Sequence, residues 1–140
     1  MTCSDVLEVI GSLVSSLKIY ASKLPAVVHL SNIPQGLRPT PETVDGYEQA
    51  VYRYRDRSVT SSYRRLNDLF IESLEAFEAG HLFGAIQPLL AVIDHLEVMQ
   101  RDKEINATPA EEKRMAEYRT ALNKILPGNQ PELEGAGRGM

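Results

Sequence analysis

Cysteine is almost absent from this chain of 140 residues. The single cysteine, Cys3, cannot form an intrachain disulfide, and a lone thiol is typical of proteins from a reducing compartment. We therefore expect a cytoplasmic protein. No basic residue flanks Cys3 in the sequence, so nothing indicates a reactive thiolate. A chain of this length buries roughly two-thirds of its unfolded surface, and it needs neither a disulfide nor a metal for stability.

Long apolar runs and alternating patterns are also missing. The first apolar stretch, Val6–Leu17, is interrupted by Glu8, Gly11 and several serines, and no basic region precedes it. We therefore expect neither a signal peptide nor a membrane span. No alternating run of apolar and polar residues is bounded by turn residues, so β-strands are not expected.

A strong charge of one sign is missing as well. Lysine and arginine number 15 against 19 aspartates and glutamates, which gives a formal net charge of -4 at pH 7. This balance argues against a protein that coats nucleic acid with its whole surface. It leaves room for a local basic patch.

The motifs of enzyme chemistry are absent: there is no Ser/His/Asp or Cys/His arrangement, no phosphate-binding loop and no CxxC pair. Glu78 and His81 have the spacing of di-iron bundle ligands, but such sites need a second pair. Neither His29 nor His95 has a carboxylate three positions earlier, and Gly80 ends the helix within the motif. We therefore expect no enzyme, no cofactor and no metal site.

Apolar residues do recur at helical spacing, most clearly between Thr60 and Lys103. This stretch predicts two amphipathic helices joined by a turn at Gly80. The second helix is apolar around more than half its circumference, which is typical of a central helix with neighbours on several sides. We place Pro88 in its first turn, where the missing N–H costs nothing, so this helix is expected to begin near Gly84 or Ala85. Residues His81–Phe83 are then the expected connector after Gly80.

The fold class predicted from these patterns is all-α, a single-domain bundle of about five helices built around the central αα-hairpin. Proline after Thr40 and after Thr108 marks two helix starts. The apolar stripe changes direction near Ser58, which predicts a break between the second and third helices. The expected helices are 5–24, 41–57, 61–79, 85–103 and 109–126.

The remaining segments are assigned by composition. Residues 25–40 are rich in proline but too apolar for a free linker, so we expect an ordered loop over the bundle. Residues 128–140 lack apolar periodicity, and we expect a disordered tail. The helical domain is therefore expected to cover residues 1–127.

Arginine and tyrosine gather in segment 52–65, which holds five arginines and three tyrosines. Guanidinium groups bind phosphates and carboxylates, and tyrosine rings stack on bases or on guanidinium groups. The alternative, which we favour, is that Tyr54 and Tyr63 are core residues and the arginines lie on a solvated helix face, with local pairs such as Arg64 and Asp68. The candidate partner-binding residues are Tyr52, Arg53, Arg55, Arg57, Arg64 and Arg65.

The order of features between Tyr63 and Leu96 resembles that of the helical flagellar export chaperones and of other small bundles, so it points to no single family. We expect a non-enzymatic helical interaction module, which is an adaptor, a small chaperone or a subunit of a larger assembly. The expected partner is another protein or a second copy of the chain, because the wide apolar stripes of the first and fourth helices indicate surface left to cover. The second hypothesis is a nucleic-acid- or phosphate-binding accessory protein that uses segment 52–65. No membrane partner is expected.

Overall fold

The computed structural model describes residues 2–22 and 39–125. In these residues the chain forms five α-helices, one short 3-10 helix and no strand, which confirms the predicted all-α bundle. Most of the expected loop 25–40 and all of the expected tail 128–140 lie outside the described residues. The elements are α1 Cys3–Ser22, α2 Pro41–Ser58, η3 Ser62–Leu66, α3 Asn67–Glu78, α4 Leu82–Arg101 and α5 Pro109–Ile125.

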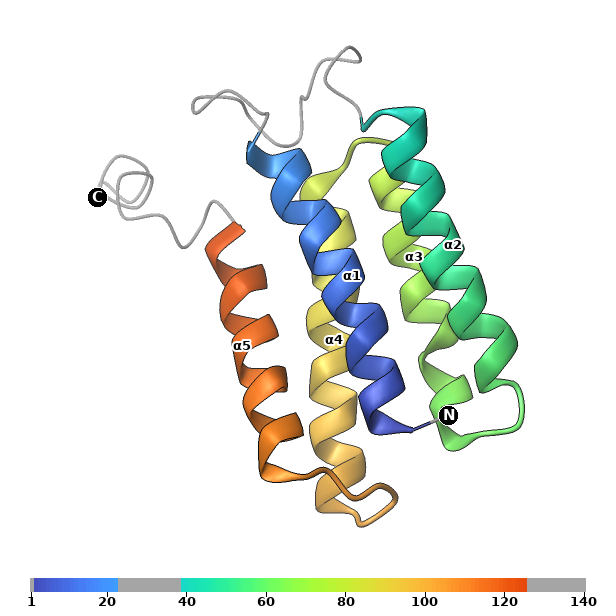
Figure 1. The fold of residues 1–140 in the computed structure, drawn as a ribbon, viewed down its shortest axis with the longest axis vertical. Coiled ribbons are helices and arrows are strands. Elements are labelled where there is room, and N and C mark those ends of the chain that lie inside the picture. The colour runs from blue at the N-terminus through green and yellow to red at the C-terminus, as the bar shows by residue number, and fades with distance from the viewer. Residues whose placement is uncertain (1, 23–38, 126–140) are drawn as a thin grey trace.

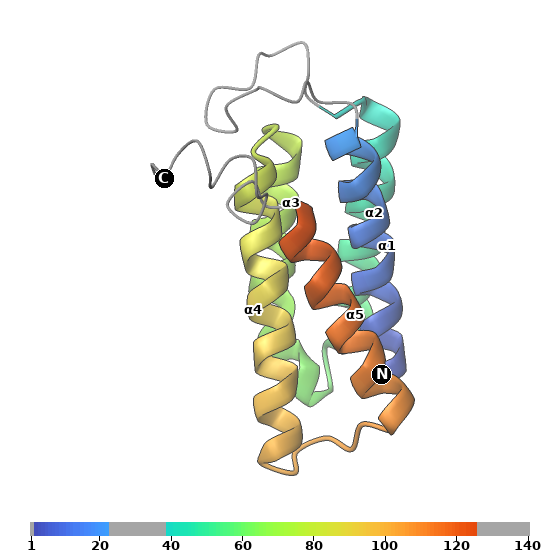
Figure 2. The same ribbon diagram turned by 90° about the vertical axis from the view of Figure 1, so that its left-hand side faces the viewer.

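The first four helices form an up-and-down bundle. α1 packs on α2, α2 on α3, and α3 on α4, and successive helices alternate in direction (Figure 1). α5 runs in the same direction as α1 and lies across the gap between α1 and α4 (Figure 2). α3 and α4 form the predicted αα-hairpin. α2 and α5 lie on opposite sides of the bundle.

Capping residues set the beginning of three helices. The Thr2 N–H donates to Asp5 Oδ2 at 2.8 Å, and the Asp5 N–H donates to Thr2 Oγ1 at 3.2 Å. Thr108 and Glu111 exchange the same two bonds at 2.9 and 3.1 Å. The Thr40 hydroxyl caps α2 ahead of a proline at its first position. These local signals explain why the helix starts after Thr40 and Thr108 were predicted correctly.

Helix α2 ends at Ser58, where the change in direction of the apolar stripe predicted a break between helices. The Ser61 N–H donates to the Ser58 carbonyl at 3.0 Å, and Ser61 Oγ accepts from the Tyr63 N–H at 3.2 Å. The expected third helix, 61–79, is therefore a short 3-10 helix followed by α3 from Asn67. The bend lets Tyr54 of α2 and Tyr63 of η3 both enter the core, where the Tyr54 hydroxyl donates to the Tyr63 carbonyl.

The start of α4 corrects the sequence prediction. α4 begins at Leu82 instead of near Ala85, so Pro88 lies inside the helix and not in its first turn. Leu82 is buried, which favours the longer helix. The Ser73 hydroxyl of α3 donates to the Ala85 carbonyl at 2.7 Å, in the turn that the missing N–H of Pro88 weakens. The carbonyl that Pro88 leaves without a helical donor is that of Gly84, so the bond from Ser73 holds the neighbouring carbonyl of the same turn.

The turn between α3 and α4 is tight because Gly80 takes a positive φ of 79°. The His81 N–H donates to the Ala76 carbonyl at 2.8 Å, which closes the end of α3. The turn is too short for the three-residue connector that was expected after Gly80. At the other end, α4 stops at Arg101, two residues before the expected end, because Lys103 takes a positive φ of 64°.

α4 is the central helix of the bundle, as predicted. Leu89, Ile93 and Leu96 are each 0% exposed. By length and composition α4 could also cross a membrane, although half of that stretch is buried inside the bundle. The apolar stripes of α1 and α4 are likewise buried within one chain, so they do not by themselves indicate self-association. The exposed large apolar residues in the described part are Ile19, Tyr52, Val59, Phe83 and Val98.

Candidate functional site

The candidate residues share one end of the bundle. Four of them, Tyr52, Arg53, Arg55 and Arg57, lie in the last two turns of α2, and Arg64 and Arg65 lie in η3. All six side chains are exposed, whereas the neighbouring tyrosines of the segment belong to the core. The core placement of these tyrosines confirms that part of the favoured alternative. Of the five arginines, Arg57 and Arg65 form ion pairs with residues outside the segment's own helices. The other three do not.

Arg57 connects the end of α2 to the beginning of α1. Its guanidinium Nη2 lies 3.3 Å from Asp5 Oδ2. The pKa of Asp5 is lowered from its ordinary value, chiefly because the Thr2 N–H donates to its carboxylate, with the Thr2 hydroxyl and Arg57 adding to the effect. Arg57 therefore has a partner inside the chain and is only partly available to another molecule.

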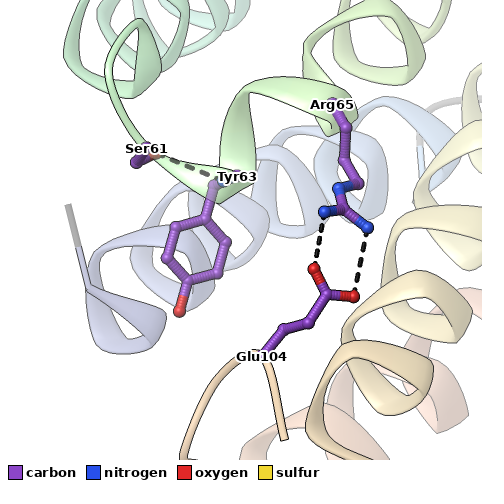
Figure 3. A network of polar contacts seen from close by, with 4 residues as sticks. All are labelled: Ser61, Tyr63, Arg65 and Glu104. Carbon is purple, nitrogen blue, oxygen red and sulfur yellow. Dashed lines mark hydrogen bonds and ion pairs between the residues drawn. The ribbon is translucent and has the colours of Figure 1, made fainter. Parts of the chain in front are cut away.

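Arg65 connects η3 to the loop between α4 and α5 (Figure 3). Its two guanidinium nitrogens donate to the two carboxylate oxygens of Glu104 at 3.3 and 2.6 Å. A bidentate pair of this kind has fixed geometry. The ion pair of Arg65 therefore connects η3 to the loop that follows α4.

Tyr52, in the last turns of α2, and Val59, the residue that follows α2, are exposed large apolar residues. They are 37% and 53% exposed and are seven residues apart, which places them on one helical stripe. The Arg55 guanidinium lies 4.6 Å from the centre of the Tyr52 ring, and Arg55 Nε lies 3.2 Å from Asp56 Oδ1. Arg55 is thus held on the surface next to an exposed aromatic ring.

Arg53 and Arg64 form no ion pair with any residue that the structure describes. The predicted pair between Arg64 and Asp68 is absent from these contacts, because Arg64 belongs to η3 and Asp68 to α3. The i, i+4 geometry of a single α-helix is therefore lost. Beside Arg64 lies an open depression of about 500 Å³, lined also by residues 59–62 and Arg65. We call the surface of Tyr52, Arg53, Arg55, Val59 and Arg64 the α2 patch.

Cys3, Glu78 and His81 are the described residues that the sequence analysis considered for reactive or metal chemistry. The Cys3 side chain is buried, and desolvation together with the nearby Glu111 raises the pKa of its thiol to about 11. No group of three or more metal-ligating side chains occurs in the part of the chain that the structure describes. Glu78 ends α3 and His81 precedes α4, so these two residues do not share a helix.

A second surface was not anticipated from the sequence. Three lysines, Lys18 of α1 with Lys113 and Lys124 of α5, line a shallow groove of about 530 Å³. They are separated by as many as 106 positions in the chain, so only the parallel packing of α1 and α5 brings them together. No sequence window contains all three lysines, and local pattern could not have found this surface.

Comparison of the chain with protein-family models, with curated proteins and with solved structures finds no match.

Proposed function

We propose that the chain is a non-enzymatic helical interaction module, an adaptor, small chaperone or assembly subunit, that contacts a protein partner through the α2 patch. The observation that supports this most directly is the exposed pair of Tyr52 and Val59 beside the stacked Arg55. Aromatic and arginine side chains are the residues that most often dominate binding energy at protein interfaces. α2 lies at one side of the bundle, so this face is open to a partner.

The charges of the patch indicate the chemistry of the partner. Arg53 and Arg64 have no ion pair among the described residues; Arg53 follows Tyr52 in α2, and Arg64 lines the same depression as Val59. A partner surface with an apolar centre and acidic residues at its edge would complement the patch. The depression next to Arg64 offers room for one such acidic side chain.

The same geometry disfavours the second hypothesis, nucleic-acid binding. Arg55, Arg57 and Arg65 are engaged with Asp56, Asp5 and Glu104, so three of the five arginines already have carboxylate partners. One face of the Tyr52 ring is covered by Arg55, which leaves less of the ring for a stacked base. A few local phosphate contacts would also act against the net charge of -4.

An affinity pull-down from the native source tests the proposal, with the full chain as bait and with and without nuclease. The variant Tyr52→Ala/Arg53→Glu should lose the bound partner, whereas Gln49→Ala, on the same exposed side of α2, should retain it. Both changes lie at exposed positions, and unaltered melting curves would verify the fold. Retention of every captured protein by the double variant would reject the α2 patch as the contact surface.

A titration of labelled oligonucleotides tests the second hypothesis separately. We expect no binding at about 50 mM salt, a condition that favours phosphate contacts. Binding that weakens with salt, with a slope reduced by about two units in Arg53→Ala/Arg64→Ala, would favour the nucleic-acid hypothesis instead.

A further inference from the structure

The groove between α1 and α5 has the dimensions of a helix-binding site. Its residues on α5 extend from Lys113 to Ile125 and repeat at intervals of three and four, so they lie along one face of the helix. Lys113 and Lys124 are 11 positions apart, which corresponds to about 16 Å, or three helical turns, along α5. The groove is therefore long enough for about three turns of a second helix.

Small side chains line the groove between its lysines. Ala116, Thr120 and Ala121 lie between the two lysines of α5, and Ile125, next to Lys124, also lines the groove. Ala116 and Thr120 are exposed, while Ala121 and Ile125 are half-buried against the core. Small side chains let a second helix approach closely, and the methyl groups give it apolar surface to cover.

The rim of the groove is positively charged. Lys113 stands at one end, and Lys18 and Lys124 stand at the other, while Glu117 is the one acidic residue that lines it. None of the three lysines forms an ion pair with a described residue. Their aliphatic stems also add to the apolar walls. This concentration of positive charge contrasts with the acidic balance of the chain as a whole.

We propose that this groove binds an amphipathic helix from a partner protein, with acidic side chains at both ends of an apolar stripe. The acidic side chains would meet Lys113 at one end and Lys18 and Lys124 at the other. The apolar stripe would cover Ala116, Thr120 and Ala121, which is the arrangement of a helix in a groove. This surface is separate from the α2 patch and lies on the opposite side of the bundle, so either interface can fail without the other.

A defined peptide pair tests the proposal by NMR on the ¹⁵N-labelled full chain. The first peptide is a synthetic amphipathic helix with leucine and alanine on one face and glutamates spaced to meet both ends of the groove. The second has every glutamate replaced by lysine. The acidic peptide should shift the backbone amide signals of Ala116, Thr120 and Ala121, and it should bind more weakly as salt is raised. The basic peptide should leave these signals unchanged.

Charge reversal tests whether the lysines of the groove bind the acidic peptide. Lys113→Glu/Lys124→Glu should weaken binding of the acidic peptide at least about tenfold. Lys103→Glu, an exposed lysine of the loop between α4 and α5 that does not line the groove, is the matched control and should bind as the unaltered chain does. Equal shifts with both peptides, no shift up to about 1 mM acidic peptide, or equal weakening in the control would overturn the proposal.

A truncated chain distinguishes a partner helix from an occupant within the same chain. Residues 128–140 are removed and the amide spectra are compared without peptide. Unchanged groove signals and unchanged peptide binding are the expected result. If the groove signals shift on truncation and the acidic peptide binds only the truncated chain, then the groove holds the chain's own C-terminal segment, and the proposal is overturned.

Discussion

At the scale of single residues, Gly11 of α1 leaves the space that the end of the Tyr118 side chain of α5 occupies. A Cβ at this position would lie 2.6 Å from the Tyr118 hydroxyl oxygen and 3.2 Å from its Cζ. Tyr118 is itself held by Arg114, whose Nη2 donates to the hydroxyl at 3.3 Å. A side chain at Gly11 would therefore require the half-buried Tyr118 side chain to move, even though alanine suits a helix interior better than glycine.

We predict that Gly11→Ala lowers the free energy of unfolding by about 1–3 kcal/mol, because the added methyl forces Tyr118 to move. Without this clash the same change would stabilise the helix by about 0.5–1 kcal/mol. The Tyr118→Phe background removes the nearest atom and should recover part of the loss, which chemical denaturation of all four proteins would measure. Strictly additive effects would show that the two residues do not compete for the same space.

Asp5 gives the molecule a pH-dependent contribution to stability. Its folded pKa lies below the ordinary value of 3.8, chiefly because of the hydrogen bond from the Thr2 N–H. A lowered folded pKa contributes stability above the unfolded pKa, and this contribution is lost as the pH falls through the folded pKa.

We therefore predict that Asp5→Asn lowers the melting temperature at neutral pH, because the bond to Arg57 and the charge at the start of α1 are lost. The difference from the unaltered chain should shrink as the pH is lowered from about 5 to about 2, as followed by circular dichroism. Asp45→Asn, an exposed aspartate of α2, controls for the loss of one negative charge. A difference that stays constant with pH would contradict the assignment.

At the scale of helices, local signals predicted most boundaries and tertiary contacts decided the rest. The starts of α2 and α5 were predictable because Thr40 and Thr108 cap them through bonds to residues three positions away. The break after Ser58 was predictable from the direction of the apolar stripe. The start of α4 was not, because it depends on the burial of Leu82 and on the contact of Ser73 with the turn before Pro88.

Gly80 and Gly46 give a matched test of helix ends and helix interiors. Gly80 takes a positive φ of 79° at the end of α3, and an L side chain there is strained. Gly46 lies within α2, and no atom lies within 4 Å of a Cβ built on it. The same substitution should therefore have opposite effects at the two positions.

We predict that Gly80→Ala lowers the free energy of unfolding by about 1–2 kcal/mol. Gly46→Ala should raise it by about 0.5–1 kcal/mol, because alanine loses less conformational freedom in a helix than glycine. Denaturant midpoints at a common slope would measure both changes. A neutral Gly80→Ala would mean that the chain can close the turn between α3 and α4 in another conformation.

At the scale of the whole molecule, the sequence located the arginine-rich segment 52–65. It could not predict which of these arginines form ion pairs with distant residues. The concentration of arginine is visible in the sequence, and the exposure of Tyr52 follows from helical spacing. The engagement of Arg57 with Asp5 and of Arg65 with Glu104 depends on partners 52 and 39 positions away, which no local pattern contains. The lysine groove between α1 and α5 was missed for the same reason.

The five helices share one hydrophobic core, in which α4 lies at the centre. We predict that Ile93→Ala lowers the free energy of unfolding by about 2–5 kcal/mol, because Ile93 is fully buried and its loss leaves a cavity. Val98→Ala on the same helix, where the side chain is 40% exposed, should change it by no more than about 0.5 kcal/mol. Both substitutions shorten an aliphatic side chain on the same helix, so the main difference between them is the burial of the side chain.

Because the core is continuous, Ile93→Ala should shift one cooperative transition, seen alike by circular dichroism and by tyrosine fluorescence. Two separated transitions would mean that part of the bundle unfolds independently of α4.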